Sequence, residues 1–241
     1  DTHRLAVPIH FEPNVGQFDP QVRFIARGAK YQAWITDTEL VLAFPTNAPS
    51  FAKDPRDRPE PRPLQREIVR IKFGGKTPST ATGLEKQSSV SNYFLGNNPA
   101  KWRSNVPNFA KVRLEEVYPG IDAVFYGRGK EIEYALIVKP GADPAVISMR
   151  LDSPRTPHKN FLGDISIALA KGRFTHRAPI AFQGDKPLIA DARFTNGRLG
   201  FALGAYDRSR PVTIDPVLEY ATYLGGGGDE ELVQSIVVDG A

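Results

Sequence analysis

Short segments in which apolar and polar residues alternate recur along most of this chain, and they limit the folds it can adopt. They lie at residues 22–28, 30–36, 39–44, 67–73, 120–127, 131–138, 146–151, 164–169, 188–194, 199–205 and 217–223. A period of two residues is typical of antiparallel strands that bury one face. Because 21 Gly and 21 Pro punctuate the chain, long helices have little room. The sequence predicts an all-β protein made of antiparallel β-sandwich-like units.

The size and composition of the chain exclude several classes of protein. With 241 residues, 41% of them hydrophobic, the chain can form its own core without metals or disulfides. It has no cysteine, which excludes disulfides, thiol catalysis and thiolate metal sites. No apolar run approaches the roughly 20 residues of a membrane span. The net charge of +4 is spread along the chain, so we expect no nucleic-acid partner.

A proline- and arginine-rich stretch divides the sequence. Residues 45–66 contain six prolines and few apolar side chains, which is typical of an exposed loop or linker. A proline-rich ligand for a partner is the alternative interpretation. We therefore expect an N-terminal β segment at 1–44, the linker at 45–66 and a main β-sandwich-like domain at 67–216. Residues 74–89 also have the composition of a loop.

Two carboxylates in one predicted hairpin are the weak catalytic candidates. If residues 127–130 form a four-residue loop, the strands before and after it share one wholly apolar face and place Asp122 and Glu133 diagonally on the other. Diagonal neighbours lie roughly 7–8 Å apart, within the approximate range for an inverting glycosidase. The alternative is a solvated face on which Arg113 or Lys111 neutralises the carboxylates.

No other sequence motif indicates catalysis or a cofactor. The four histidines (His3, His10, His158 and His176) lack metal-ligand spacing, and no nucleophile motif occurs. Residues 70–77 lack the first glycine of a phosphate-binding loop. Residues 225–233 partly match a calcium-binding repeat. We therefore expect no cofactor, and Ca²⁺ is the alternative.

Four blocks of the sequence resemble a known bacterial domain. They cover residues 11–28, 91–151, 199–218 and 219–239, and the second begins "SNYFLGNNPAKWRSNVPNF". They are similar to the N-terminal domain that precedes SBBP (β-propeller-type) repeats in large exported bacterial proteins. The resemblance implies an all-β domain in an extracellular or cell-surface setting, with no established catalytic residues. The start of the chain at Asp1 rather than at Met is a further hint of export.

The resemblance also implies roles for the aromatic residues of the second block. They would be core or interdomain anchors: Tyr93, Phe94, Trp102 and Phe109. Trp102 lies between Lys101 and Arg103, and its alternative role is to stack on a sugar ring or a partner surface.

The last segment, 217–241, resembles the start of a first propeller-type repeat. A blade normally has four strands, and this segment offers two apolar strand patterns, at 217–224 and 232–238. They can pack back on the domain or stay mobile, or, as a second outcome, add to the sheet edge of a neighbouring molecule. For the second outcome, the self-association residues are Val217, Leu218, Tyr220, Tyr223, Leu232, Val233, Ile236 and Val237.

The leading functional expectation is a non-catalytic structural or adhesive module of a bacterial cell-surface protein. Its partners would be other copies of itself or further repeats of the parent chain. The alternative is a carbohydrate-binding module or glycan-active enzyme, with surface glycans as the partner and Trp102, or Asp122 with Glu133, as the site.

Overall fold

The structure, a computed structural model, describes residues 9–28, 30–46, 65–74, 80–94, 96–129 and 131–222. Nearly all of its regular secondary structure is β-strand, which confirms the all-β prediction. The first nine strands are β1 (Phe11–Pro13), β2 (Val22–Arg27), β3 (Gln32–Thr36), β4 (Glu39–Pro45), β5 (Arg66–Lys72), β6 (Ala81–Tyr93), β7 (Arg103–Tyr118), β8 (Ile121–Arg128) and β9 (Glu131–Val138).

The second half of the described chain has shorter strands. They are β10 (Met149–Asp152), β11 (His158–Lys159), β12 (Ile165–Leu169), β13 (Gly172–His176), β14 (Ile180–Gln183), β15 (Lys186–Leu188), β16 (Ala190–Thr195), β17 (Arg198–Leu203), β18 (Val212–Asp215) and β19 (Leu218–Ala221). Two single-turn 3₁₀ helices are η1 (Pro99–Lys101) and η2 (Pro144–Val146). No helix in the described part of the chain is long and apolar enough to cross a bilayer.

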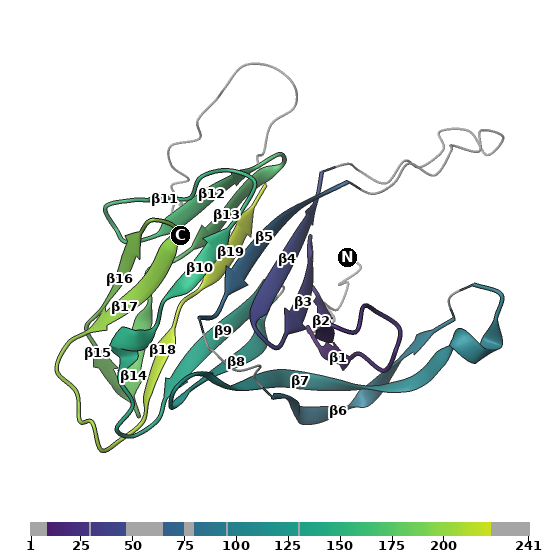
Figure 1. The fold of residues 1–241 in the computed structure, drawn as a ribbon, viewed down its shortest axis with the longest axis horizontal. Coiled ribbons are helices and arrows are strands. Elements are labelled where there is room, and N and C mark those ends of the chain that lie inside the picture. Colours follow the sequence, from purple (N-terminus) through teal and green to yellow (C-terminus); the bar gives the residue numbers. More distant parts are fainter. Residues whose placement is uncertain are drawn as a thin grey trace, which may run out of the picture.

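The strands form two antiparallel sheets of very different size (Figure 1). The large sheet has the order β15, β14, β18, β9, β8, β7, β1, β2, β3, β4, β5, β10, β17, β16, with β6 paired to β7 outside this path. The small sheet has the order β11, β12, β13, β19. Since the large sheet runs from β15 to β16 without joining its ends, it is an open sheet.

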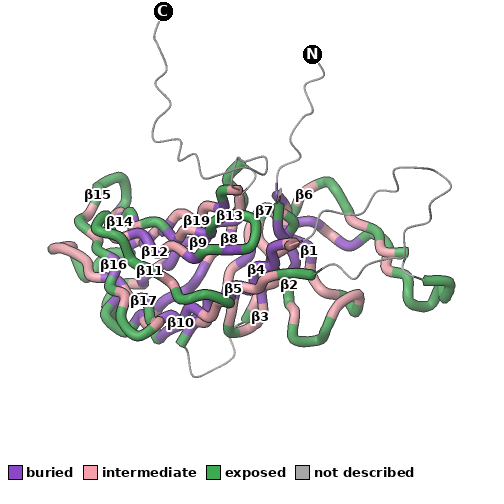
Figure 2. The backbone as a smooth tube through the Cα atoms, turned by 90° about the horizontal axis from the view of Figure 1, so that it is seen from above, coloured by how far each residue is buried: buried purple, intermediate pink, exposed green. Residues whose placement is uncertain are grey.

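The large sheet curves so that strands distant along it face each other. Phe73, next to the end of β5, lies 6.1 Å from Phe125 of β8, measured between ring centroids. The small sheet covers the same interior, where Phe44 of β4 lies 5.9 Å from Phe174 and 4.8 Å from Tyr220. The buried hydrophobic side chains of both sheets form one continuous core, and Figure 2 shows the buried segments gathered inside the body.

The stretch at 45–66 does not separate two packed units. β4 pairs with β5 over seven residues, from Glu39 opposite Lys72 to Pro45 opposite Arg66, and β1 pairs with β7. The expected segments 1–44 and 67–216 therefore share one sheet and one core. Residues 47–64 lie outside the described residues.

The prediction of a loop at 74–89 is wrong from residue 81 onward, because β6 begins at Ala81. Most side chains of β6 are exposed or half-buried, on both faces. A strand that covers no core has no need of apolar alternation, so its sequence carried no strand signal.

The hairpin of β8 and β9 has a tighter turn than expected. Arg128 pairs with Glu131, so the loop has two residues rather than four. The register therefore moves by two residues, which keeps each side chain on its expected face. Phe125 pairs with Tyr134, and both are fully buried as expected.

The start of the C-terminal segment packs back on the domain. β19 pairs with β13, from Leu218 opposite His176 to Ala221 opposite Arg173. Leu218 is 2% exposed and Tyr220 8%, and the carbonyl of Val217 accepts a hydrogen bond from the Arg177 amide. Leu218 and Tyr220 are core residues and are not free to join a second molecule, which corrects the self-association site. Val217 is half-buried, and the remaining members lie outside the described residues: Tyr223, Leu232, Val233, Ile236 and Val237.

Candidate functional site

The strands β6 and β7 extend beyond the body of the sheet as a two-stranded arm (Figure 1). β7 pairs with β1 at Phe109 and with β8 from Lys111 onward. Its earlier residues pair with β6 alone, up to the pair Tyr93 and Arg103. We call residues 90–94 and 96–107 the arm. Figure 2 shows that its outer end is largely exposed.

The turn at the end of the arm holds two aromatic rings in fixed positions. The Asn98 side chain accepts a hydrogen bond from the Ala100 amide at 3.0 Å and caps η1. The indole Nε1 of Trp102 donates to the carbonyl of Gly96 at 3.1 Å. The Trp102 ring packs edge-on against Phe94, with ring centroids 5.3 Å apart. Phe94 is 61% exposed and Trp102 39%, so this pair, the aromatic tip, lies at the surface.

Arg103 ties the arm to the loop between β1 and β2. Its Nε donates to the carbonyl of Val15 at 2.8 Å, and another guanidinium nitrogen donates to the carbonyls of Ala100 and Trp102. The same loop is organised by Asn14, whose amide donates to the carbonyls at Asp19 and Val22. The aromatic tip is therefore fixed relative to the sheet.

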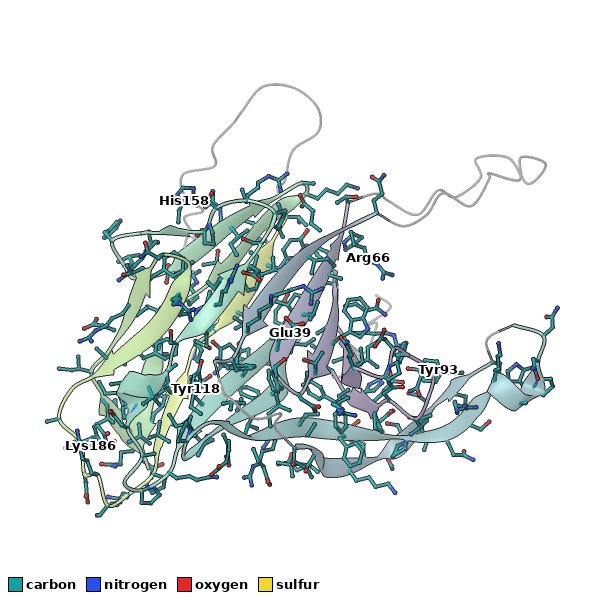
Figure 3. The ribbon with its side chains drawn as sticks, in the orientation of Figure 1. Glu39, Arg66, Tyr93, Tyr118, His158 and Lys186 are labelled. Atoms are coloured by element: carbon teal, nitrogen blue, oxygen red, sulfur yellow. The ribbon has the colours of Figure 1, made fainter. Side chains whose placement is uncertain are left out.

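A buried carboxylate of β1 anchors the arm. Tyr93, labelled in Figure 3, donates its hydroxyl to Glu12 at 2.5 Å and accepts a hydrogen bond from Arg27 at 3.0 Å. Arg27 also forms an ion pair with Glu12, which is 1% exposed. Burial raises the pKa of Glu12, but the hydrogen bonds from His10, Tyr93 and Ser91 and the charge of Arg27 outweigh it and lower this pKa to about 2.

The structure divides the four aromatic anchors of this segment. Phe109 packs against the core, and Tyr93 is half-buried where the arm contacts Glu12 and Arg27. Phe94 and Trp102 are instead at the surface, so the expectation of a core role is wrong for them. Polar side chains of this segment form hydrogen bonds with its backbone. The Asn92 side chain accepts a hydrogen bond from the amide of Asn105, a residue in the left-handed region with a φ of 57°.

Asp122 and Glu133 do not form a catalytic pair. Asp122 lies opposite Ile137, while Glu133 lies opposite Tyr126. Four residues along the ladder separate them, which is about 13 Å. The expected diagonal contact fails because the turn has two residues rather than four.

The two carboxylates have separate structural partners and are buried rather than solvated, contrary to the expected wet face. Asp122 contacts Lys139 at 2.8 Å and accepts a hydrogen bond from the Glu116 amide. Glu133 lies 3.6 Å from Arg128, and burial raises its pKa.

No group of three or more His, Asp or Glu side chains that could hold a metal ion occurs in the described ranges. The stretch suggested for Ca²⁺, residues 225–233, lies outside them.

Comparison with known proteins identifies a family. No curated protein and no solved structure matches the chain. Residues 11–217 match a family described as "Domain of unknown function (DUF7948)", and this match covers every strand from β1 to β18. The chain therefore belongs to the DUF7948 family.

Proposed function

We propose that this domain is a non-catalytic structural and adhesive module of an exported bacterial protein, and that it binds further copies of itself through the arm. The observation that carries the proposal is the aromatic tip, an exposed Phe94–Trp102 pair on an arm that Tyr93 and Arg103 anchor to the sheet. The proposal therefore moves self-association from the C-terminal segment to the arm.

The arm has the physical properties of a docking element. A two-stranded hairpin alone is marginally stable in water, and its exposed apolar area is reduced when another surface covers it. Aromatic side chains are enriched in interface cores and among the residues that contribute most to binding. Because Arg103 and Tyr93 already fix the arm, docking costs little conformational entropy.

A second copy is the partner that best fits the arm. In the described part of the chain, β6 pairs with β7 and with no other strand, so its outer edge presents unpaired amides and carbonyls. An antiparallel arrangement of two arms satisfies both edges and brings each tip onto the other molecule. The register shifts near Val90 and Tyr93 restrict such pairing to a short length, and the tips then supply most of the contact.

Matched double variants test this proposal. Sedimentation analysis over a range of protein concentrations should show reversible association of the unmodified chain. The variant F94A/W102A should weaken association by at least about tenfold, because two aromatic contacts are lost. The control F161A/L162A removes two other exposed apolar side chains, 95% and 62% exposed, and should associate normally. A monomeric unmodified chain, or equal behaviour of the two variants, contradicts self-association through the tip.

The extracellular setting and the connection to SBBP repeats are part of the same proposal. Their support is the resemblance of residues 91–151 and 199–239 to domains of that type. Protease treatment of intact cells that produce the full parent protein should digest this domain. If the protease digests the domain only after the cells are lysed, the domain does not lie on the cell surface.

Carbohydrate binding at Trp102 is the second candidate function. It is favoured by the partial exposure of this indole between Lys101 and Arg103. Binding of neutral glycans that W102A abolishes, with no self-association of the unmodified chain, would favour this function over the first.

A further inference from the structure

The outer face of the large sheet carries a row of cations that crosses three neighbouring strands. Lys72 of β5 lies directly opposite Arg150 of β10. Arg150 lies directly opposite Arg198 of β17. Residues opposite each other in an antiparallel pair point to the same face at a Cα separation of about 4.5–5.5 Å. This cation row therefore spans about 10 Å. On the opposite face of the same three strands, the neighbouring residues Ile71, Met149 and Leu199 are buried in the core.

Like charges directly opposite each other are destabilising, and only part of the row is neutralised. Asp152 contacts Lys72 and Arg150, each at 2.6 Å. Arg198 makes one long hydrogen bond, 3.5 Å to the Ser148 hydroxyl. Arg193 of β16, which lies opposite Gly200 on the same face, forms no ion pair with any described residue. Among the residues that the structure describes, the guanidinium groups of Arg193 and Arg198 thus have no anionic partner.

Both of these arginines line the same hollow. It has a volume of about 440 Å³, and its polar lining includes Ser148, Arg193, Thr195, Asn196 and Arg198. Asn196 and Gly197 form the two-residue turn between β16 and β17, with φ angles of 51° and 73°. Such a turn fixes the two strands rigidly. The hollow offers two guanidinium forks, two hydroxyls and an amide, which are the donors that bind carboxylate, sulfate or phosphate groups.

We propose that this face binds an anionic polysaccharide, with one acidic group in the hollow between Arg193 and Arg198 and the next along the cation row. Strands lie about 4.8 Å apart, close to the length of one pyranose unit along a polysaccharide chain. An acidic group on successive sugars therefore meets a cation on successive strands.

The shape and charge of the surface favour a polysaccharide over a nucleic acid. The cations lie on a sheet face, whereas readers of duplex DNA insert a helix or a ribbon into a groove. Asp152 lies within the row, and Asp191 lies on the same face two residues from Arg193. A flexible single polysaccharide chain can place its acidic groups on the cations and keep them away from these carboxylates, whereas the two phosphate rows of duplex DNA have a fixed spacing.

The site is separate from the aromatic tip, and its test is independent of self-association. Titration calorimetry at physiological ionic strength would use dextran sulfate as the probe, with neutral dextran, inorganic sulfate and duplex DNA as comparison ligands. The unmodified chain should bind dextran sulfate, should bind DNA more weakly, and should not bind neutral dextran. F94A/W102A should bind dextran sulfate as the unmodified chain does.

Charge-matched variants locate the binding surface. R193Q/R198Q should weaken dextran sulfate binding by about tenfold or more, because two charge-assisted contacts are lost. R173Q/K186Q removes two exposed charges elsewhere, one of them on β15 where Figure 3 labels Lys186. It should change the affinity by less than about twofold, since distant surface charges are screened.

Several outcomes would overturn the proposal. Equal weakening by the two double variants would mean attraction by net charge alone. Binding of inorganic sulfate without dextran sulfate would mean a small-anion site. DNA that binds more tightly than dextran sulfate and depends on Arg193 and Arg198 would assign the face to nucleic acid. Failure of the unmodified chain to bind dextran sulfate would remove the proposal altogether.

Discussion

At the scale of single residues, two buried titratable groups, His176 and Glu12, should make the stability of this fold sensitive to acid. His176 is completely buried, and its Nε2 lies 2.7 Å from the hydroxyl of Tyr134. Burial lowers the pKa of His176 to about 4, because the charged imidazolium loses its hydration. Glu12 of β1 is the opposite case, a buried carboxylate kept charged by its neighbours.

His176 should make folding stability depend on pH between about 6.5 and 4. The unfolded chain has the higher pKa and binds more protons in this window, so the contribution is complete above about 6.5 and is lost as pH falls through 4. The loss amounts to about 3 kcal/mol. Urea unfolding at several pH values should show a flatter profile for H176Q than for the unmodified chain. H158Q, which changes the exposed histidine of β11, should leave the profile unchanged, and a steep profile in H176Q would contradict this origin.

Glu12 should make folding stability depend on pH in a more acidic range than His176 does. Its pKa is lowered in the folded state, so the stabilisation is present above about 4.5 and is lost as pH falls toward 2. E12Q should cost about 2 kcal/mol at neutral pH, since Tyr93 and Arg27 lose a charged acceptor, and should flatten the profile below 4.5. E115Q, on an exposed residue of β7, is the control. If both variants unfold alike at every pH, the cluster does not contribute to stability.

At the scale of elements, the contact of β19 with β13 depends on the absence of a side chain. Gly172 begins β13 with a φ of 139°, and a Cβ there would lie 2.1 Å from the Ala221 carbonyl oxygen. This approach brings Tyr220 against Phe44 and closes one side of the core. A glycine is thus required at a point where the C-terminal segment joins the fold.

The variant G172A should destabilise the protein by about 3 kcal/mol, because it combines backbone strain with a clash between two strands. G141A is a matched control: Gly141 also has a positive φ, of 78°, but a Cβ there would meet nothing within 4 Å beyond its own chain neighbours. It should cost only about 1 kcal/mol. Thermal and urea unfolding of the two variants would measure the difference. Equal costs would show that the close approach of β19 does not matter.

At the scale of the whole molecule, the folded unit extends past the family match. The match ends at residue 217, while β19 runs from Leu218 to Ala221 and supplies two core residues. A unit that ends at 217 would leave Phe44 and Phe174 without their contacts to Tyr220 and its neighbours.

Two truncated chains test where the folded unit ends. A chain of residues 1–222 should unfold cooperatively with a midpoint near that of the full chain. A chain of residues 1–217 should lose more than about 4 kcal/mol, since two large buried side chains are removed, and this is a large share of a typical domain's stability. Circular dichroism melts would compare them. Similar midpoints for all three chains would show that β19 is dispensable.

The sequence predicted much of the local structure and little of the candidate site. Alternating segments such as 131–138 marked their strands correctly, while β6 was missed because none of its side chains is buried and apolar residues therefore need not alternate along it. The aromatic residues of 91–109 were recognised as important, but nothing local distinguishes the exposed Trp102 from the core-packed Phe109. The cation row was invisible because Lys72, Arg150 and Arg198 are far apart in the chain.

The sequence by itself determined the fold class and the inward face of each recognised strand, because a pleated backbone alternates its side chains with a fixed period of two. Only the tertiary structure decided which strands are neighbours and in what register. Those choices depend on turns and on contacts between distant segments: a two-residue turn separated Asp122 from Glu133, and β10 lies between β5 and β17. The cation row arises from such long-range pairing, whereas the aromatic tip is assembled within one hairpin and is only positioned by long-range contacts such as that of Arg103 with Val15.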